Sequence, residues 1–234
     1  VGCGAPSCAS CVVQYAAPAT PTSGTVTVAY RISNNTVPAC QATGVLTVSI
    51  CSTTATNDAG SICAGTTRTF NVLSNDSTTC GTLDCTTMQL VAPVPAGFSL
   101  VGCGVASCAS CVVQYIAPAT PTSGTVTVAY RISNNSTPAC QATGVLTVTI
   151  CSTTAGNDSG QICAGTTRTF DVLANDSTVC GALDCTTMQL VAPVPTGFSL
   201  VGCGVASCAN CLIQYGAPAS RGTGSVTVAY RISN

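Results

Sequence analysis

Short runs in which hydrophobic and polar residues alternate recur along this chain, separated by glycine, proline, asparagine and serine. Alternation with a period of two places every second side chain on the same face of an extended strand. No run has the 3.6-residue period of an amphipathic helix. The pattern predicts an all-β fold, with strands over residues 167–173, 186–192, 198–202, 111–116, 124–133 and 143–151.

The alternation is clearest in two of these runs. In 124–133 one face carries Val126, Val128, Tyr130 and Ile132, while threonine, alanine and arginine occupy the other. The apolar face of 143–151 carries leucine, valine and isoleucine at every second position. Each of these strands is expected to turn one face toward a core and the other toward water, as in a β-sandwich.

The whole pattern repeats with a period of 100 residues. Residues 101–200 differ from residues 1–100 at 14 positions, and residues 201–234 begin a third copy. A stretch of small polar residues, 51–63, has no apolar pattern and is typical of a connector between domains. We therefore predict Ig-like repeats of about 100 residues, with the C-terminal half of one repeat in 1–55, a complete repeat in 56–155 and the N-terminal part of a third in 156–234. The chain is expected to be a window on a longer array.

In that phase the framework of the unit resembles the bacterial Ig-like and cadherin-like tandem repeats of surface adhesins and extracellular matrix fibres. The segments that carry the resemblance are residues 157–160, 169–176, 124–132 and 144–150, and the Val-Leu-Ala-Asn-Asp run at 172–176 is the most specific of them. The resemblance implies a seven-strand sandwich strung head to tail in a large secreted protein. The cysteine content is the departure, since those repeats are usually poor in cysteine.

The composition narrows the classes of partner. The chain has six arginines, seven aspartates and neither lysine, glutamate nor histidine, and its net charge is −1. Nucleic acids and anionic membrane surfaces are bound through clustered basic side chains, which are lacking here. No run approaches 18 apolar residues, so we expect no membrane span.

The 19 cysteines indicate a secreted, disulfide-stapled scaffold in an oxidising compartment. Eight recur at identical offsets in each hundred residues, and eight cysteines allow 105 pairings. A Cys51–Cys63 bridge, with Cys151–Cys163 as its copy, would lock one domain against the next, while the alternative is bonding to a neighbouring chain. The candidate disulfide cysteines are Cys51, Cys63, Cys80, Cys85, Cys103, Cys108, Cys111, Cys140, Cys151, Cys163, Cys180 and Cys185.

Cys-x-x-Cys pairs at Cys8/Cys11, Cys108/Cys111 and Cys208/Cys211 raise two other possibilities, a redox centre or half of a zinc site. The absence of histidine from the chain and of a second such pair from the unit favours structural disulfides instead.

Asp58, Asp76, Asp158 and Asp176 are a weak calcium alternative, because cadherin-like repeats hold calcium in the corresponding loops. Calcium takes six to eight oxygen ligands with several carboxylates, and three recurring acidic residues per unit are few. We prefer local turns in which these side chains bond their own backbone. Otherwise we expect no metal and no cofactor.

The glycosylation candidates, which fit the N-x-[ST] acceptor pattern, are Asn34, Asn75, Asn134, Asn157 and Asn175. The recurring arginines, Arg31, Arg68, Arg131 and Arg168, are expected on outward faces, and Tyr30 and Tyr130 in the core.

Catalysis is improbable from the side chains available, since the chain offers no histidine, lysine or glutamate to act as acid or base. We expect neither an enzyme nor a small-molecule substrate. The sequence favours a structural component of an extracellular filament, sheath or surface layer that self-associates into a polymer or array. The alternative is the repetitive stalk of a cell-surface adhesin that presents a distal binding domain.

Overall fold

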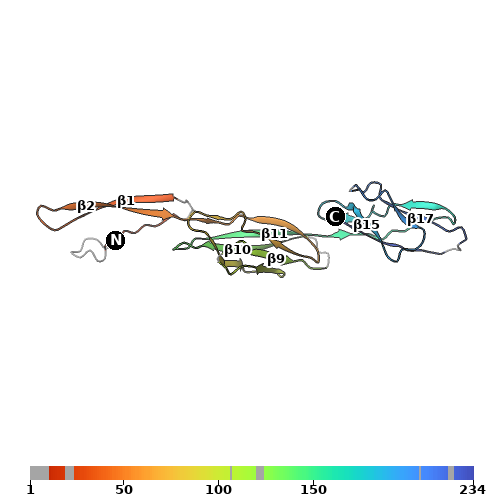
Figure 1. The fold of residues 1–234 in the computed structure, drawn as a ribbon, viewed down its shortest axis with the longest axis horizontal. Coiled ribbons are helices and arrows are strands. Elements are labelled where there is room, and N and C mark those ends of the chain that lie inside the picture. Colours follow the sequence, from red (N-terminus) through yellow and green to blue (C-terminus); the bar gives the residue numbers. More distant parts are fainter. Residues whose placement is uncertain (1–10, 19–23, 106, 120–123, 206, 221–223) are drawn as a thin grey trace. The chain divides into compact units, whose positions relative to one another are not determined.

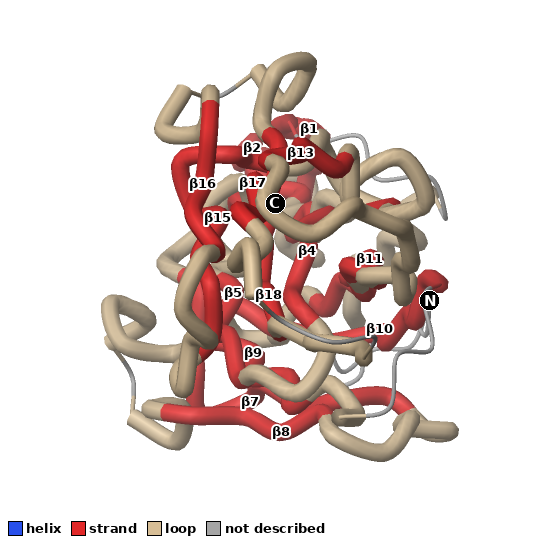
Figure 2. The backbone as a smooth tube through the Cα atoms, turned by 90° about the vertical axis from the view of Figure 1, so that its right-hand side faces the viewer, coloured by secondary structure: helices blue, strands red, loops and turns tan. Residues whose placement is uncertain are grey.

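The structure is a computed structural model, and it describes residues 11–18, 24–105, 107–119, 124–205, 207–220 and 224–234. Strands and loops make up this part of the chain, and Figure 2 shows no helix in it. No helix among the described residues is therefore long and apolar enough to span a membrane. The predicted all-β class is confirmed.

The middle repeat is a sandwich of two sheets (Figure 1). One sheet has the strand order β4-β11-β10-β7, and the other has the order β5-β9-β8. These seven strands agree with the predicted disulfide-stapled Ig-like sandwich. Their bounds are β4 (Asp58–Cys63), β5 (Thr67–Phe70), β7 (Leu83–Val91), β8 (Phe98–Val101), β9 (Val112–Ile116), β10 (Gly124–Asn134) and β11 (Gln141–Cys151).

The other strands belong to smaller sheets. Residues before the middle repeat form the antiparallel hairpin β1-β2, and short strands pair as β3-β6 and β12-β14. The third repeat contains β13-β17-β16 and β15-β18. Their bounds are β1 (Gly24–Ser33), β2 (Gln41–Ile50), β3 (Thr53–Thr54), β6 (Ser77–Thr78), β12 (Thr153–Thr154), β13 (Thr167–Phe170), β14 (Ser177–Thr178), β15 (Asp184–Val191), β16 (Phe198–Val201), β17 (Leu212–Gly216) and β18 (Ala229–Ser233).

The core of the middle repeat is built by the predicted alternation. Val128, Tyr130 and Ile132 of β10 are at most 2% exposed, while the residues between them are partly exposed. Every second residue of β11 is buried in the same way, and β9 contributes Val113 and Tyr115. Apolar faces of both sheets therefore meet between them, as the period of two requires.

The copies of these residues in β1 are exposed. Val28, Tyr30 and Ile32 of β1 are 44%, 47% and 61% exposed, although their neighbours in sequence match those of Val128, Tyr130 and Ile132. Residues 1–234 contain no segment ahead of β1 that corresponds to β5 through β8 of the middle repeat. Burial at this offset thus depends on the facing sheet and not on the local sequence.

The predicted connector over residues 51–63 is wrong for its second half. Residues 58–63 form β4, which lies beside β11, and Ile62 is only 4% exposed. A single apolar residue in a polar stretch left no alternation to recognise. The copy at 158–163 forms no strand, because the third repeat within residues 1–234 lacks the segment that corresponds to β11.

The described chain divides into two compact units, residues 1–58, 69–114 and 128–146 in the first and residues 59–68, 115–127 and 147–234 in the second. This division does not follow the 100-residue period. The repeat boundaries near residues 55 and 155 stay a prediction.

Candidate functional site

Six disulfides between described residues recur as three pairs at identical offsets. One set joins Cys51, just ahead of the middle repeat, to Cys80, and joins Cys85 to Cys108 and Cys103 to Cys111 within that repeat. The third repeat has the same set, Cys151–Cys180, Cys185–Cys208 and Cys203–Cys211. Two repeats with separate surroundings thus adopt one connectivity, which is what a unit copied with its staples would do.

Two of these bonds fix one loop. Cys85 lies in β7, whereas Cys103, Cys108 and Cys111 lie in or next to the loop between β8 and β9. The backbone N–H of Gly104 also donates to the carbonyl oxygen of Cys85 at 3.2 Å. Cys85 and Cys111 are buried, so this cross-linked loop closes one side of the core.

The expected bridges across the connector are wrong. Cys51 pairs with Cys80 rather than Cys63, and Cys151 pairs with Cys180 rather than Cys163. Cys63 and Cys163 are exposed free thiols, and Cys140, another candidate, is a partly buried free thiol. Spacing along the chain favoured the nearest cysteine, while strand pairing of β3 with β6 brings residues 51 and 80 together from 29 positions apart.

The Cys-x-x-Cys pairs do not form bonds within themselves. Cys108 and Cys111 each bond a different partner, and Cys208 and Cys211 do the same in the third repeat. A redox centre of this type needs the two sulfurs to bond each other, and a zinc site needs them free. In Cys8/Cys11 the first cysteine lies outside the described residues, and Cys11 is disulfide-bonded.

Several hydrogen-bond acceptors surround the hydroxyl of the buried Tyr130 in the middle repeat. The Oη of Tyr130 lies 3.0 Å from the carbonyl oxygen of Thr56 and 3.2 Å from that of Val72. Both carboxylate oxygens of Asp76 are 3.1 Å away, and Oδ2 of Asp58 is 3.2 Å away. The single hydroxyl proton of Tyr130 therefore lies among acceptors from two segments of the chain, residues 56–58 and 72–76.

The third repeat builds the same cluster. The hydroxyl of Tyr230 contacts the carbonyl oxygens of Gly156 and Val172 and the carboxylates of Asp158 and Asp176, at 3.0 to 3.3 Å. Asp76 and Asp176 also accept a backbone N–H from Thr56 and Gly156, each at 2.7 Å. The interpretation of these aspartates as local turn residues is wrong, because their partners lie 17 or more positions away along the chain.

A glycine makes room for the tyrosine ring. A Cβ placed on Gly144 of β11 would lie 2.5 Å from Cζ of Tyr130, closer than any real contact, so only glycine fits beside this ring. The alternation pattern signals the tyrosine as a core residue but not its hydroxyl partners. The Tyr and Gly at matching offsets in each copy were the only signal that the sequence offered.

The cluster raises the pKa of its ionisable members. Burial is the largest cause for the Asp58 and Asp76 carboxyls, and hydrogen bonds from Tyr130 partly offset it. The pKa of Tyr130 is raised by burial and by the charges of Asp76 and Asp58, so its hydroxyl keeps its proton and donates. The neutral Tyr130 hydroxyl thus holds the Asp58 and Asp76 carboxyls together, and no basic side chain takes part in these contacts.

We expect Tyr130→Phe to destabilise the middle repeat by about 1 to 3 kcal/mol, because it leaves carboxylate and carbonyl acceptors in a half-buried site without their donor. Tyr30→Phe is the matched control, since Tyr30 is 47% exposed and the same substitution there should change little. Calorimetric unfolding of the two variants measures the difference. Equal losses in both would contradict the role given to the hydroxyl.

The raised pKa values set the sign of a pH effect. A folded state whose carboxyls have raised pKa values holds protons that the unfolded chain has already released, so its stability falls as pH rises through the raised values. Asp58→Asn removes one of these groups, and we expect it to stabilise the middle repeat at pH 7 relative to pH 3.5. Urea unfolding of both proteins at the two pH values checks this. A relative stabilisation that is larger at the acidic pH would contradict it.

No group of three or more histidine, cysteine, aspartate or glutamate side chains that could hold a metal ion occurs among the described residues. Asp58 and Asp76 meet at Tyr130, and Asp158 and Asp176 meet at Tyr230, so each cluster brings two carboxylates together. Calcium usually takes more carboxylates than this. The weak calcium alternative stays a prediction.

The glycosylation candidates lie in different surroundings. Asn34, Asn75, Asn157 and Asn175 are exposed. Asn134 is 1% exposed, and its amide donates to Oγ1 of Thr78 and to the carbonyl oxygen of Cys80. Asn134 is therefore a structural residue, and its assignment as an acceptor site is wrong.

The remaining polar candidates are structural as well. Asp84 accepts from the backbone N–H and hydroxyl of Thr86, which is the local turn the sequence predicts, and the pKa of its copy Asp184 is lowered by the same pair of bonds, the hydroxyl first. Arg131 donates to the Gln89 side chain at 3.0 Å on the outward face of β10.

Neither a protein-family model nor a curated protein matches the chain. Solved structures with some likeness include a nucleoside hydrolase-related hypothetical protein from Saccharophagus degradans that is associated with carbohydrate metabolism, with 12% identity and a TM-score of 0.30 over 40% of this chain and 22% of that one. Cadherin domains 3–6 of protocadherin gamma B2 align with 12% identity and a TM-score of 0.31 over 92% of this chain and 55% of that one. Domains 1–3 of protocadherin gamma C5 align with 13% identity and a TM-score of 0.30 over 82% and 67%. The chain thus spans 22% and 55% of the length of the first two, and at TM-scores of 0.30 and 0.31 these likenesses support no conclusion about this chain.

Proposed function

We propose that this chain is a structural component of an extracellular filament, sheath or surface layer, built from disulfide-stabilised tandem β-sandwich repeats. The observation that carries the proposal is the exact recurrence of three disulfides and one tyrosine–aspartate cluster at a spacing of 100 residues. Near-identical units present the same surface at each step, which a periodic polymer needs. The disulfides favour an oxidising compartment outside the cell.

The proposal assigns no catalytic role to the chain. Histidine, lysine and glutamate are absent from the sequence, and the aspartates of the two clusters are engaged with tyrosine hydroxyls. Such groups hold segments of a repeat together and offer no pair of acid and base poised toward an open site.

The partner of this chain is a second copy of itself, and the two copies associate by exchanging a β-strand. In the third repeat Val228, Tyr230 and Ile232 pack against a buried cluster around Met188 and Ile213. Val28, Tyr30 and Ile32 of β1 occupy the same offsets in their copy, so β1 of one chain matches the face that receives β18 in another. Exchange of identical elements between copies is a common route to assembly.

Strand exchange predicts that residues 1–234 associate in a concentration-dependent way and that Ile32→Asp weakens the association. Ile32 is 61% exposed, so the variant removes an apolar contact without disturbing the sandwich of the middle repeat. Sedimentation of both proteins over a range of concentrations measures this. Sedimentation of the parent as a monomer at every concentration would contradict exchange.

Electron microscopy of the native cell-surface material, with and without reductant, tests the filament itself. We expect filaments with a regular axial repeat that soften or dissolve when the disulfides are reduced. Single flexible tethers with a different domain at the tip would instead support the alternative, the repetitive stalk of a cell-surface adhesin that presents a distal binding domain.

A further inference from the structure

Four described cysteines carry free thiols, and they occupy only two positions of the repeat. Cys40 and Cys140 are copies of one position, and Cys63 and Cys163 are copies of the other. The other cysteines that the structure describes are disulfide-bonded. A thiol left over at the same two offsets in successive copies is a property of the repeat.

The first position, that of Cys140, lies beside the disulfide that joins Cys51 and Cys80. The Sγ of Cys140 is 3.3 Å from the carbonyl oxygen of Cys51, the residue that bonds Cys80. Asn134 fixes this arrangement, because its Oδ1 accepts the backbone N–H of Cys140 at 2.7 Å while its Nδ2 donates to the carbonyl oxygen of Cys80. All of these residues belong to the first compact unit.

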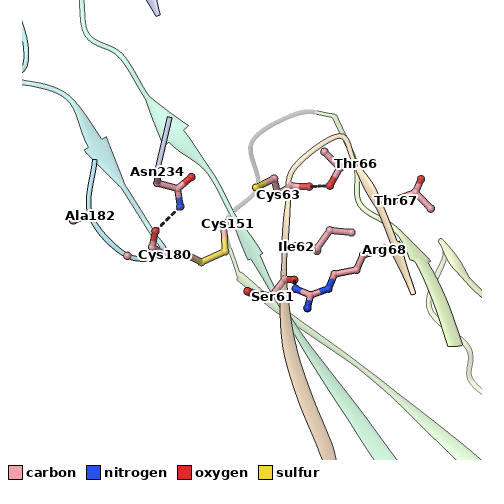
Figure 3. A pocket seen from close by; sticks show the side chains of 11 residues that line it. Ser61, Ile62, Cys63, Thr66, Thr67, Arg68, Cys151, Cys180, Ala182 and Asn234 are labelled. Atoms are coloured by element: carbon pink, nitrogen blue, oxygen red, sulfur yellow. Dashed lines mark hydrogen bonds between the residues drawn. A yellow bond between two sulfur atoms is a disulfide. The ribbon is translucent and has the colours of Figure 1, made fainter. Parts of the chain in front are cut away.

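The second position, that of Cys63, lies beside the Cys151–Cys180 disulfide, which is the copy of Cys51–Cys80. Cys63 is the last residue of β4, and the N–H of the next residue, Ala64, donates to the carbonyl oxygen of Cys151 at 2.9 Å. Figure 3 shows Cys63 on one side of a hollow that the Cys151–Cys180 bond and Asn234 also line. These residues all belong to the second unit.

The two cysteine positions lie next to equivalent atoms, because Cys51 and Cys151 are copies of each other and the carbonyl oxygen of each is contacted. The carbonyl oxygen of residue 51 is approached by the Cys140 thiol, and that of residue 151 is approached by the amide that follows Cys63. Asn234 already donates to the carbonyl oxygen of Cys180, as Asn134 does to that of Cys80. A cysteine six positions after Asn234 would then have its sulfur against the carbonyl oxygen of Cys151, within reach of Cys63 for a disulfide.

We propose that each cysteine at the Cys63 position forms a disulfide with the cysteine at the Cys140 position of the repeat that follows, so that every junction of the array carries a covalent cross-link besides the peptide chain. The two members of such a pair are 177 positions apart and do not occur together within residues 1–234, which accounts for all four free thiols. The cross-link applies equally to a filament and to a stalk.

The bond forms by thiol–disulfide exchange. One cysteine, as thiolate, attacks a disulfide of an oxidant such as a secreted thiol oxidoreductase or a small-molecule disulfide, and a mixed disulfide results. The second thiolate then displaces the oxidant from this mixed disulfide. The two protein thiols lose two protons and two electrons in total, and both sulfurs of the oxidant's disulfide leave as thiols.

The test uses residues 1–234 lengthened after Asn234 by a copy of residues 135–155, in which the copy of Cys151 is replaced by serine. Oxidised protein is alkylated without reduction, digested and mapped by mass spectrometry. We expect a disulfide between Cys63 and the added copy of Cys140, and one alkylated cysteine fewer than in the unlengthened chain. The six disulfides already described, found unchanged in the same map, show that the repeats have folded.

Two variants of the lengthened chain are the controls. Cys63→Ser should leave the added cysteine alkylated, whereas Cys163→Ser should leave the cross-link intact. A lengthened chain with its six disulfides in place but with Cys63 and the added cysteine both alkylated would overturn the proposal, as would a bond from the added cysteine to Cys163.

A map of the native array protein, made without reduction, gives a second and independent measurement. Cysteines at the Cys63 and Cys140 positions should escape alkylation and appear in linked peptides. Alkylation at both positions in the native protein would overturn the cross-link, even where microscopy shows filaments. A cross-linked map from material without filaments would instead contradict the proposed function alone.

Discussion

Full reduction of the disulfides should unfold the repeats at room temperature. The three bonds of the middle repeat close loops with sequence separations of 29, 23 and 8 residues. By the loop-entropy relation, the two longer ones stabilise the fold by about 3.5 kcal/mol each, and the short one by about 2.5 kcal/mol. Their combined effect is of the order of the whole stability of a typical domain, about 5 to 15 kcal/mol.

Urea unfolding followed by circular dichroism, with and without a thiol reductant, measures this effect. The control is the pair of substitutions Cys103→Ala and Cys111→Ala, which opens only the shortest loop and should lower the midpoint much less than full reduction does. An unchanged midpoint after complete reduction would show that the sheets hold together without their staples.

Replacing one core isoleucine should have the next largest effect, and it should have it in only one of two copies. Ile132 of β10 is fully buried, so Ile132→Ala should cost the middle repeat about 2 to 5 kcal/mol through lost burial and the cavity left behind. Ile32→Ala makes the same change in β1, where the side chain is 61% exposed, and at a dilution at which copies do not associate it should stay within about 0.5 kcal/mol.

Differential scanning calorimetry of the two variants against the parent checks this contrast, since both carry the same chemical change with similar neighbours in sequence. Equal shifts in the two variants would mean that β1 is covered in solution. A small shift for Ile132→Ala would mean that the two sheets of the middle repeat do not pack as described.

Strand positions could be predicted from the sequence because alternation is a local property. The predicted run at 124–133 corresponds to β10 (Gly124–Asn134), and the run at 143–151 falls within β11 (Gln141–Cys151). The segment 58–63 could not be predicted, since it forms a strand only where β11 lies beside it, and its copy at 158–163 forms none. A strand without an alternating pattern depends on backbone partners that are distant in sequence.

Three properties follow from the amino-acid sequence alone: a β fold, a repeat of 100 residues and stabilisation by disulfides. Which cysteines bond depends on the tertiary fold, because pairing requires short distances between strands and not a given spacing along the chain. The tertiary fold also decides that Asp58 and Asp76 meet at the hydroxyl of Tyr130 and that Tyr30 stays exposed. Side chains with the same neighbours in sequence differ in burial and bonding because these depend on what the rest of the fold places opposite them.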